Sequence, residues 1–212
     1  MQDTVHLYVF DGLADWEAAF AVAGIQDPRC QREPGRWRVR TVGEQQGAIV
    51  RSMGGVGVLV DIGFDHLRAS SSRLLILPGG AGWEDDRLHR AALGRAAECL
   101  SRGVPVAAIC GATAGLARAG LLDQREHTSN AAAYLRGTGY AGAARYRDEL
   151  AVRDGGLITA GGMAPLEFAR AVFEELAVYE PEALEAWFQL HKTGKSEYFA
   201  RMHRAAEAGV AG

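Results

Sequence analysis

The sequence predicts an α/β protein whose mostly parallel central sheet is covered by helices on both faces. Short apolar runs alternate with segments that carry apolar residues at three- and four-residue spacing, the period of a helix. Strands and helices in this order imply right-handed crossovers and a three-layer sandwich. The 212 residues, 48% hydrophobic and 23% charged, have the composition of an ordinary globular protein. We expect a single domain over 1–212, with a core at about 4–178 and a helical extension at 179–206.

Four apolar runs are the expected strands: VHLYVF at 5–10, WRVRTV at 37–42, RLLILP at 73–78 and VPVAAIC at 104–110. A helix is expected over 12–24, where Asp11 is a candidate N-cap, and another over 88–100. In parallel sheets of this kind, ligands bind beyond the carboxyl ends of the strands. The residues that follow each strand are therefore where a functional site is expected.

Composition excludes several classes of function. A net charge of -3 and a pI near 6.1 leave no excess of basic residues for nucleic acid or anionic lipid. The first residues lack the pattern of an export signal, and no apolar run approaches the roughly 18 to 20 residues of a membrane helix, so we expect a cytoplasmic protein. The three cysteines, Cys30, Cys99 and Cys110, lack paired CxxC spacing, which predicts free thiols and no metal site. No cofactor is expected.

Two of the segments after strands carry groups that a site could use. Asp15 and Glu17 fall in the first turns of the expected helix 12–24, where the helix dipole favours an acid, so on the residues alone both have a structural explanation. The run Gly79-Gly80-Ala81-Gly82 follows the third strand and would let backbone amides approach a ligand closely. Its spacing matches neither a dinucleotide fingerprint nor a phosphate loop.

Cys110 ends the fourth strand and is followed at once by small residues and a helical pattern. This is the layout of a nucleophile elbow, a tight turn that lifts the nucleophile above the sheet and directs the next amide toward a developing oxyanion. The positive end of the following helix would favour the reactive thiolate. A buried core cysteine at the end of an apolar strand is the alternative interpretation.

Four segments, taken together, carry a resemblance to a known family. GLADWEAAFAVAG, LLILPGGAG, VAAICGATAGLA and LITAGGMAPLEFARAVFEEL occur in the order typical of the ThiJ/PfpI superfamily. The chain resembles most closely its bacterial glutamine amidotransferase-like members, partly through HTSN at 127–130 and PEALEAWFQL at 181–190. The resemblance implies a flavodoxin-like, class I glutamine amidotransferase-like fold.

The resemblance also implies roles for individual residues. Cys110 would be the elbow nucleophile, and Glu17 the buried acid whose protonated carboxyl hydrogen-bonds to the sulfur and favours the thiolate. The amides of Gly80 and Gly111 would form the oxyanion hole, with Gly79 shaping its approach. Glu17 would then tune the nucleophile, in contrast to the structural role that the residues alone suggest.

The sequence departs from a working glutaminase in its general base. The stretch GGMAPLEFA at 161–169 contains no histidine where such enzymes carry one. Other relatives place a histidine where this chain has Ser129 or Asn130, and His127 lies two or three residues early. His127 and Asn130 are therefore candidate pocket residues, and no complete triad is predicted.

Two classes of function remain open. One is a cysteine-dependent hydrolase or amidotransferase-like enzyme in which Cys110 attacks a carbonyl carbon of an unidentified small molecule. The other is a redox-sensing or stress-protective protein whose Cys110 is oxidised to sulfinate and stabilised by Glu17. The amphipathic tail after Pro181 fits packing on the domain or on a second subunit, and the resemblance implies a homodimer.

Overall fold

The computed structural model describes residues 2–85 and 87–210. Its central feature is a seven-stranded sheet in the order β5-β2-β1-β6-β7-β9-β8, in which every pairing is parallel except β8 with β9. The strands of this sheet are β1 (Asp3–Tyr8), β2 (Trp37–Gly43), β5 (Ile62–Gly63), β6 (Leu74–Leu77), β7 (Val106–Ile109), β8 (Ala151–Asp154) and β9 (Leu157–Ala160). The five strands β2-β1-β6-β7-β9 reproduce the flavodoxin-like order, in which the first strand lies between the second and the third.

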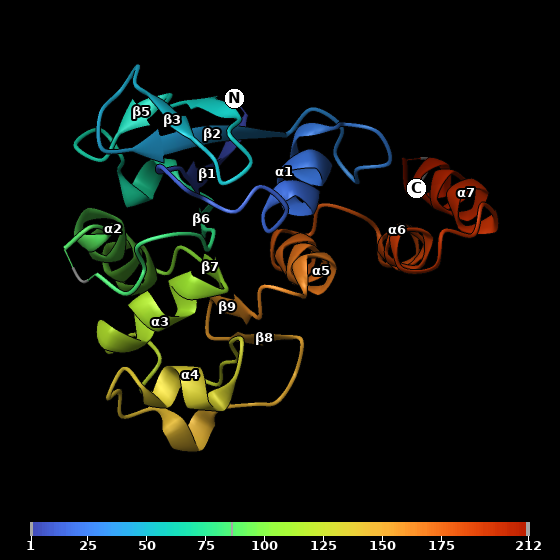
Figure 1. Ribbon diagram of the computed structural model, residues 1–212. Coiled ribbons are helices and arrows are strands. Elements are labelled where there is room, and N and C mark those ends of the chain that lie inside the picture. The colour runs from blue at the N-terminus through green and yellow to red at the C-terminus, as the bar shows by residue number, and fades with distance from the viewer. Residues whose placement is uncertain (1, 86, 211–212) are drawn as a thin grey trace.

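Helices cover both faces of the sheet, as the alternation of elements predicted (Figure 1). The helices are α1 (Ala19–Gln26), α2 (Arg90–Ser101), α3 (Gly111–Arg118), α4 (Ala132–Arg136), α5 (Pro165–Leu176), α6 (Pro181–Thr193) and α7 (Glu197–Val210), with short 3-10 turns at Ala69–Ser71 and Ala143–Arg145. Helices α2 and α3 lie on one face, and α1 and α5 on the other. The fold is thus the three-layer sandwich expected from the sequence.

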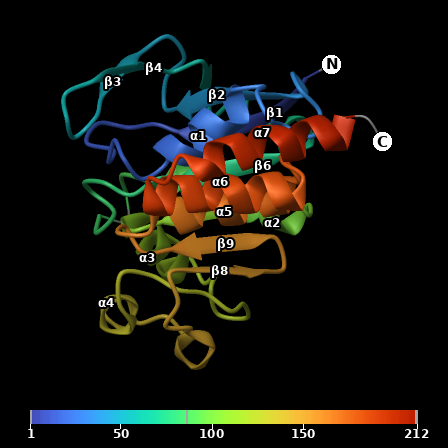
Figure 2. The same ribbon diagram turned by 90° about the vertical axis from the view of Figure 1, so that its right-hand side faces the viewer.

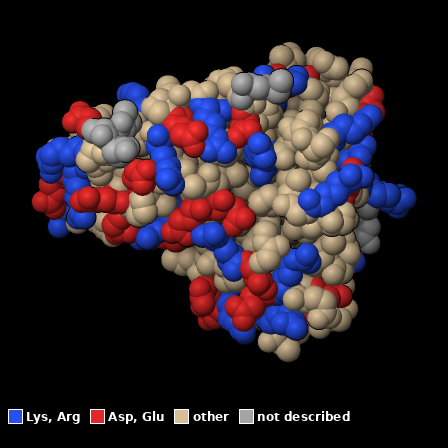
Figure 3. Space-filling model, turned by 180° about the vertical axis from the view of Figure 1, so that it is seen from behind, with Lys and Arg blue, Asp and Glu red and all other residues tan. Residues whose placement is uncertain are grey.

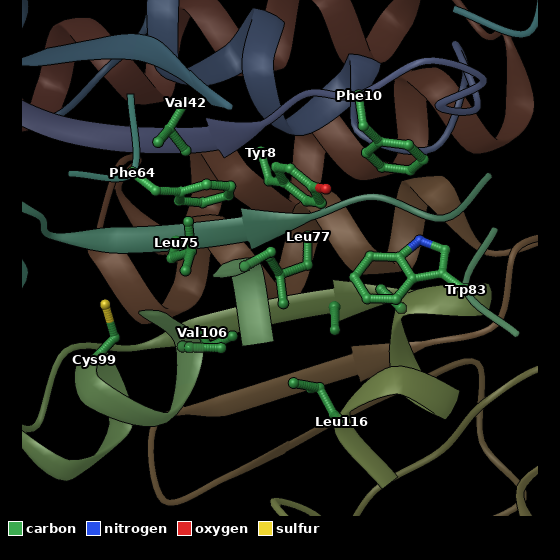
Figure 4. Packing of buried hydrophobic residues seen from close by; sticks show 14 of the residues in the cluster. Tyr8, Phe10, Val42, Phe64, Leu75, Leu77, Trp83, Cys99, Val106 and Leu116 are labelled. Carbon is green, nitrogen blue, oxygen red and sulfur yellow. The ribbon is translucent and has the colours of Figure 1, made fainter. Parts of the chain in front are cut away.

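The alternation of side chains along β6 shows how the sheet supports two cores. Leu75 and Leu77 point into the cluster beneath α2 and α3, whereas Leu74 and Ile76 point into the cluster beneath α1 and α5. All four side chains are fully buried, which is why this strand reads as a continuous apolar run. Figure 4 shows the first cluster, with Trp83 packed over the carboxyl ends of the strands.

The first helix begins later than the sequence predicts. Residues 11–18 form turns, and α1 starts only at Ala19. Gly12 has a φ of 82°, which is incompatible with a continuing right-handed helix, and Leu13 pairs with Gly80 in an isolated antiparallel bridge. Asp11 is therefore not an N-cap, and the helix dipole does not explain the position of Glu17. The segment instead forms a loop across the carboxyl ends of β1 and β6.

A two-stranded hairpin, β3 (Ile49–Arg51) with β4 (Gly57–Leu59), extends from the sheet near this loop (Figure 2). The carboxylate of Asp15 holds the hairpin turn, since it accepts hydrogen bonds from the Ser52 hydroxyl at 2.5 Å and from the Gly54 amide at 2.7 Å. These bonds lower the pKa of Asp15. The sequence did not reveal this hairpin, and Asp15 has a structural role in it.

The C-terminal extension is helical, as expected, and consists of two helices, α6 and α7. Helix α6 packs on α5, and α7 lies along α6 on the outside of the molecule (Figure 2). Trp187 joins the extension to the core, because its ring meets that of Phe173 edge-on at a centroid distance of 4.9 Å. The tail thus contacts its own domain through Trp187, and the homodimer implied by the resemblance stays a prediction.

Replacing Phe173 by alanine is expected to destabilise the protein by about 3–5 kcal/mol, because the fully buried ring contacts both Tyr179 and Trp187 and leaves a cavity when removed. The midpoint of urea unfolding followed by circular dichroism measures this loss. Phe199→Ala is the matched control, since 54% of that side chain is exposed and its loss should cost well under half as much. Equal losses for both variants would contradict this account of the core.

No helix in the described ranges is both long and apolar enough to cross a membrane. Charged side chains of both signs are interspersed over the face seen in Figure 3, where the lobe on the left contains α6 and α7. This mixture agrees with the small net charge of the sequence.

Candidate functional site

The site lies where the chain leaves the carboxyl ends of four parallel strands. The loop after β1 supplies Glu17, the turn after β6 supplies Gly79, the end of β7 supplies Cys110, and the turn after β9 supplies Gly162. A Cβ atom built on Gly162 would lie 2.8 Å from the Cys110 sulfur and 3.2 Å from Glu17 Oε1, so these groups share one small volume. The residues expected from the strand ends therefore meet at one point.

Cys110 occupies the turn between β7 and α3 in a strained backbone conformation, with φ 58° and ψ -124°. A non-glycine residue rarely adopts a positive φ, and such strain is concentrated at functional sites. The turn is fixed on both sides, because the Cys110 amide donates to the Ala160 carbonyl at 3.0 Å and the Thr113 hydroxyl donates to the Cys110 carbonyl at 2.6 Å. This geometry is that of the predicted nucleophile elbow.

The Trp83 ring packs so closely against the start of α3 that the residues facing it must be small. A Cβ on Gly111 would lie 2.9 Å from the Trp83 ring, and one on Gly115 would lie 2.6 Å from it. The indole is 1% exposed and its N–H donates to the Pro78 carbonyl at 3.0 Å. Trp83 therefore ties the glycine turn after β6 to the start of α3.

Glu17 is buried, with 1% of the residue exposed, and has two partners. Its Oε2 accepts a hydrogen bond from the Gly79 amide at 2.6 Å, and its carboxyl group is hydrogen-bonded to the Cys110 sulfur. Burial raises the pKa of Glu17, and the bonds to Cys110 and Gly79 offset part of that rise. Gly79 must be glycine for this contact, because a Cβ there would lie 2.6 Å from Oε2. The structure thus brings together the acid and the thiol that the sequence placed in one site.

Several groups around the Cys110 sulfur act on the pKa of its thiol in opposite directions. Burial raises the pKa of Cys110, and an ionised Glu17 raises it further, whereas the amide groups of Asn130 and Gly111 lower it. Because both acids are buried side by side, the loss of one proton makes the loss of the second more costly. The ionisation of Cys110 and that of Glu17 therefore oppose each other.

Asn130, one of the candidate pocket residues, lies beside the Cys110 sulfur and lines the cleft. Its Nδ2 donates to the Cys110 sulfur at 3.4 Å, while its Oδ1 accepts from the Gly162 amide at 2.8 Å. The Gly162 carbonyl in turn accepts from the Trp16 indole at 3.3 Å. Sequence reasoning missed Gly162, and it gave Trp16 no chemistry. The signal for Gly162 was its place in the glycine pair that follows the apolar run LITA at 157–160, since Gly79 and Cys110 were also found at the end of a strand.

The two glycines predicted to form an oxyanion hole have different surroundings. The Gly111 amide points at the Cys110 sulfur and lowers the pKa of the thiol. Gly80 has a φ of 138°, and no acceptor within the described parts of the chain takes a hydrogen bond from its amide. A Cβ on Gly80 would lie 2.3 Å from the Gly12 carbonyl oxygen, so glycine is required there. Both amides are compatible with the predicted role, although neither residue lines the main cleft.

His127 lies outside the cleft, contrary to the sequence-based prediction that it borders the pocket. Its Nδ1 donates to the Arg125 carbonyl at 2.8 Å, and its Nε2 accepts from the Tyr140 hydroxyl at 2.9 Å. The residue is fully buried against the rings of Tyr140 and Tyr146, and burial lowers its pKa. Both ring nitrogens are therefore occupied by local partners, and His127 has a structural role.

An open cleft of about 970 Å³ leads to Cys110. Glu17, Asn130 and Trp16 surround its inner end, and β8, α5 and Phe188 of α6 form its walls. Ion pairs span the far wall, where Arg153 bonds to Glu174 at 2.9 Å. The thiol is thus accessible to a small molecule, or to a side chain of a larger one, that enters along β8.

Gly162→Ala is expected to slow alkylation of Cys110 by iodoacetamide by about tenfold, because the added methyl group collides with the sulfur and displaces it from Glu17. Mass spectrometry of the peptide that contains Cys110 measures the rate. Gly94→Ala is the matched control, since a Cβ at that position in α2 meets open space. An unchanged rate in Gly162→Ala would contradict the close approach of the β9 turn to the sulfur.

Comparison with known proteins shows similarity over nearly the whole chain. The model of the DJ-1/PfpI family matches residues 3–175. An uncharacterized protease, YoaZ, of Bacillus subtilis (strain 168) is 40% identical over 198 residues, which cover 92% of this chain and 93% of that protein. The crystal structure of a ThiJ/PfpI family protein from Bacillus anthracis has a TM-score of 0.91 at 38% identity and covers 97% of both chains.

A shorter match is to the deglycase PH1704 of Pyrococcus horikoshii, which is 40% identical over 75 residues, covering 35% of this chain and 45% of that protein. The family match extends over most of the chain, and the long relatives agree with it in sequence and in fold. The chain therefore belongs to the DJ-1/PfpI family.

Proposed function

We propose that this protein is a cysteine-dependent enzyme of the hydrolase type that acts on the carbonyl group of a small molecule. The observation that carries the proposal is the hydrogen-bonded pair of Cys110 and Glu17 at the inner end of an open cleft. No histidine of the described residues contacts the sulfur, so the proton of the thiol has Glu17 as its partner. A carboxyl group is a general acid and base when burial raises its pKa toward neutrality.

The geometry suits an aldehyde that carries a neighbouring carbonyl. The Cys110 sulfur forms a bond to the aldehyde carbon, and the electron pair of the C=O bond moves to oxygen, where the amides of Gly80 and Gly111 would stabilise the charge. Glu17, which holds the thiol proton, gives it to that oxygen, and the resulting carboxylate then moves a proton from the same carbon to the neighbouring carbonyl carbon. The proton of the first hydroxyl group passes to the second oxygen, and the product is a thioester with a hydroxyl group on the neighbouring carbon. Water hydrolyses the thioester and releases a hydroxy acid, so no oxidant is consumed.

Amide hydrolysis fits the site less well. It requires a group that protonates the departing amine, a task that histidine performs in cysteine hydrolases. The stretch 161–169 lacks histidine, and His127 is bound to Arg125 and Tyr140. The deglycase name of one relative supports carbonyl chemistry, and the protease name of another supports hydrolysis.

Purified protein incubated with glyoxal or with glutamine tests this proposal. We expect loss of glyoxal with formation of glycolate, followed by chromatography, and no release of ammonia from glutamine. Glutamine turnover without glyoxal turnover would overturn the carbonyl assignment in favour of the amidotransferase-like one. Consumption of glyoxal without glycolate would show simple adduct formation on the protein surface, which also contradicts the proposal.

A redox-sensing function is the second candidate. Three groups lie around the sulfur that could bind sulfinate oxygens: the Glu17 carboxyl, the Asn130 side-chain amide and the Gly111 backbone amide. Titration with hydrogen peroxide and peptide mass spectrometry test it. Sulfinate formed at Cys110 well before Cys99 is oxidised, in a protein that turns over neither substrate, would favour the sensor. Further oxidation of Cys110 directly to sulfonate would contradict it.

A further inference from the structure

A second cysteine faces a histidine far along the chain, outside the Cys110 cleft. Cys30 lies in the connection between α1 and β2, and its sulfur is 3.5 Å from Nδ1 of His203 on α7. The cavities on which this pair borders share no lining residue with the cleft of Cys110.

The pair borders on an apolar cavity between α1, α6 and α7. This cavity has a volume of about 310 Å³, and its walls include the aromatic rings of Phe20, Trp187 and Phe199. A second hollow of about 320 Å³, lined in part by Pro34 and Glu207, also reaches Cys30 and His203. The thiol is therefore accessible from a chamber that suits a small molecule with an apolar chain.

Burial and two nearby carboxylates raise the pKa of the Cys30 thiol. Burial raises the pKa of Cys30, and Asp27 and Glu207 raise it further, whereas Arg29 lowers it. A protonated thiol needs a base to become a nucleophile, and the imidazole of His203 is the group in hydrogen-bonding distance. The arrangement is that of a cysteine activated by a neighbouring histidine at the moment of attack.

We propose that Cys30 and His203 form a covalent modification site for α,β-unsaturated carbonyl compounds that carry an apolar chain. The sulfur forms a bond to the β carbon of the double bond, and the displaced electron pair moves toward the carbonyl group. The thiol proton passes to His203 Nδ1 and then to the α carbon, so the reaction is an addition that consumes no further reagent. The apolar chain packs among Phe20, Trp187 and Phe199. The adduct replaces the hydrogen bond that joins α7 to the α1–β2 connection.

The test follows addition of hexenal and acrolein to the full chain in a Cys110→Ser background, by mass spectrometry of the peptide that contains Cys30. His203→Gln removes the base and is expected to slow addition at Cys30 by at least about tenfold. His191→Gln is the matched control, because His191 borders on the same cavity but bonds to the Trp187 carbonyl. Equal rates at Cys30 in the two variants would overturn the role of His203.

The role of the apolar cavity is tested separately. The quantity measured is the ratio of the rates at which hexenal and acrolein add to Cys30. We expect this ratio to be about tenfold greater in the folded protein than in the same chain unfolded in urea, because burial of the extra carbons is favourable only in the folded state. Cys99, which is 1% exposed, is the internal measure of folding: it should stay unmodified in the folded samples and react in the chain unfolded in urea. Equal ratios in folded and unfolded chains, or no addition at Cys30 in the folded protein, would overturn the site. Neither result would bear on Cys110, whose proposed activity is measured in the unsubstituted protein.

Discussion

Replacing Cys110 by serine is expected to lower kcat/KM for glyoxal by at least about 10³-fold, because a hydroxyl group in the same place remains protonated and is a far weaker nucleophile than a thiolate. The rest of the site would be preserved. Serine keeps a donor and acceptor for Glu17 and Asn130, and the strained turn depends on backbone bonds to Ala160 and from Thr113 that the substitution leaves in place. Disappearance of glyoxal and appearance of glycolate measure the loss.

Cys99→Ser is the matched control for this experiment, since Cys99 is buried on α2 and packs in the core beneath that helix. Its turnover should stay close to that of the unsubstituted protein once the fraction folded is confirmed by circular dichroism. If Cys110→Ser keeps more than about one tenth of the turnover of the unsubstituted protein, another group performs the attack and Cys110 is not the nucleophile.

The fold was predictable where sequence pattern and burial coincide. Strand β6 is buried on both faces, and its run of four apolar residues reads as a strand without further information. The expected helix over 12–24 was wrong in its first part, where pattern and burial do not coincide. Its apolar residues have helical spacing, but Leu13 pairs with Gly80 across the sheet edge and Gly12 turns the chain at a positive φ. Long-range pairing of this kind leaves no local signal in the sequence.

The site residues that lie just after a strand were predictable from the sequence. Cys110 comes directly after β7 and Gly79 comes two residues after β6, and the same rule would have found Gly162, two residues after β9. Glu17 required the family resemblance, because its contact with Gly79 depends on the loop after β1, which the sequence assigned to a helix. The sequence did not decide whether His127 or Asn130 lies beside Cys110, because the two differ by only three positions in the chain. The structure shows that the His127 imidazole bonds to Tyr140, whereas the Asn130 side chain bonds to the Cys110 sulfur.

The state of the proton shared by Cys110 and Glu17 depends on two opposing effects of the carboxyl group. An ionised Glu17 would raise the pKa of the thiol through its negative charge. A protonated Glu17 carries no charge and donates a hydrogen bond to the sulfur, which favours the thiolate. Because burial is the largest influence on Glu17 and raises its pKa, we propose that the proton resides on the carboxyl group when the sulfur is ionised.

Glu17→Gln distinguishes these states by the direction of the change. If Glu17 donates its proton to the thiolate, the weaker amide donor raises the thiol pKa by about one unit and slows alkylation at neutral pH by about tenfold. The rate of alkylation of Cys110 by iodoacetamide, followed from pH 5 to pH 10, measures both quantities. Glu167→Gln is the matched control, because Glu167 lines the same cleft but bonds to Lys192. Faster alkylation of Glu17→Gln would show that the carboxyl group is ionised beside the thiol. In that case the reaction would begin with a Glu17 carboxylate that removes the proton from the Cys110 thiol.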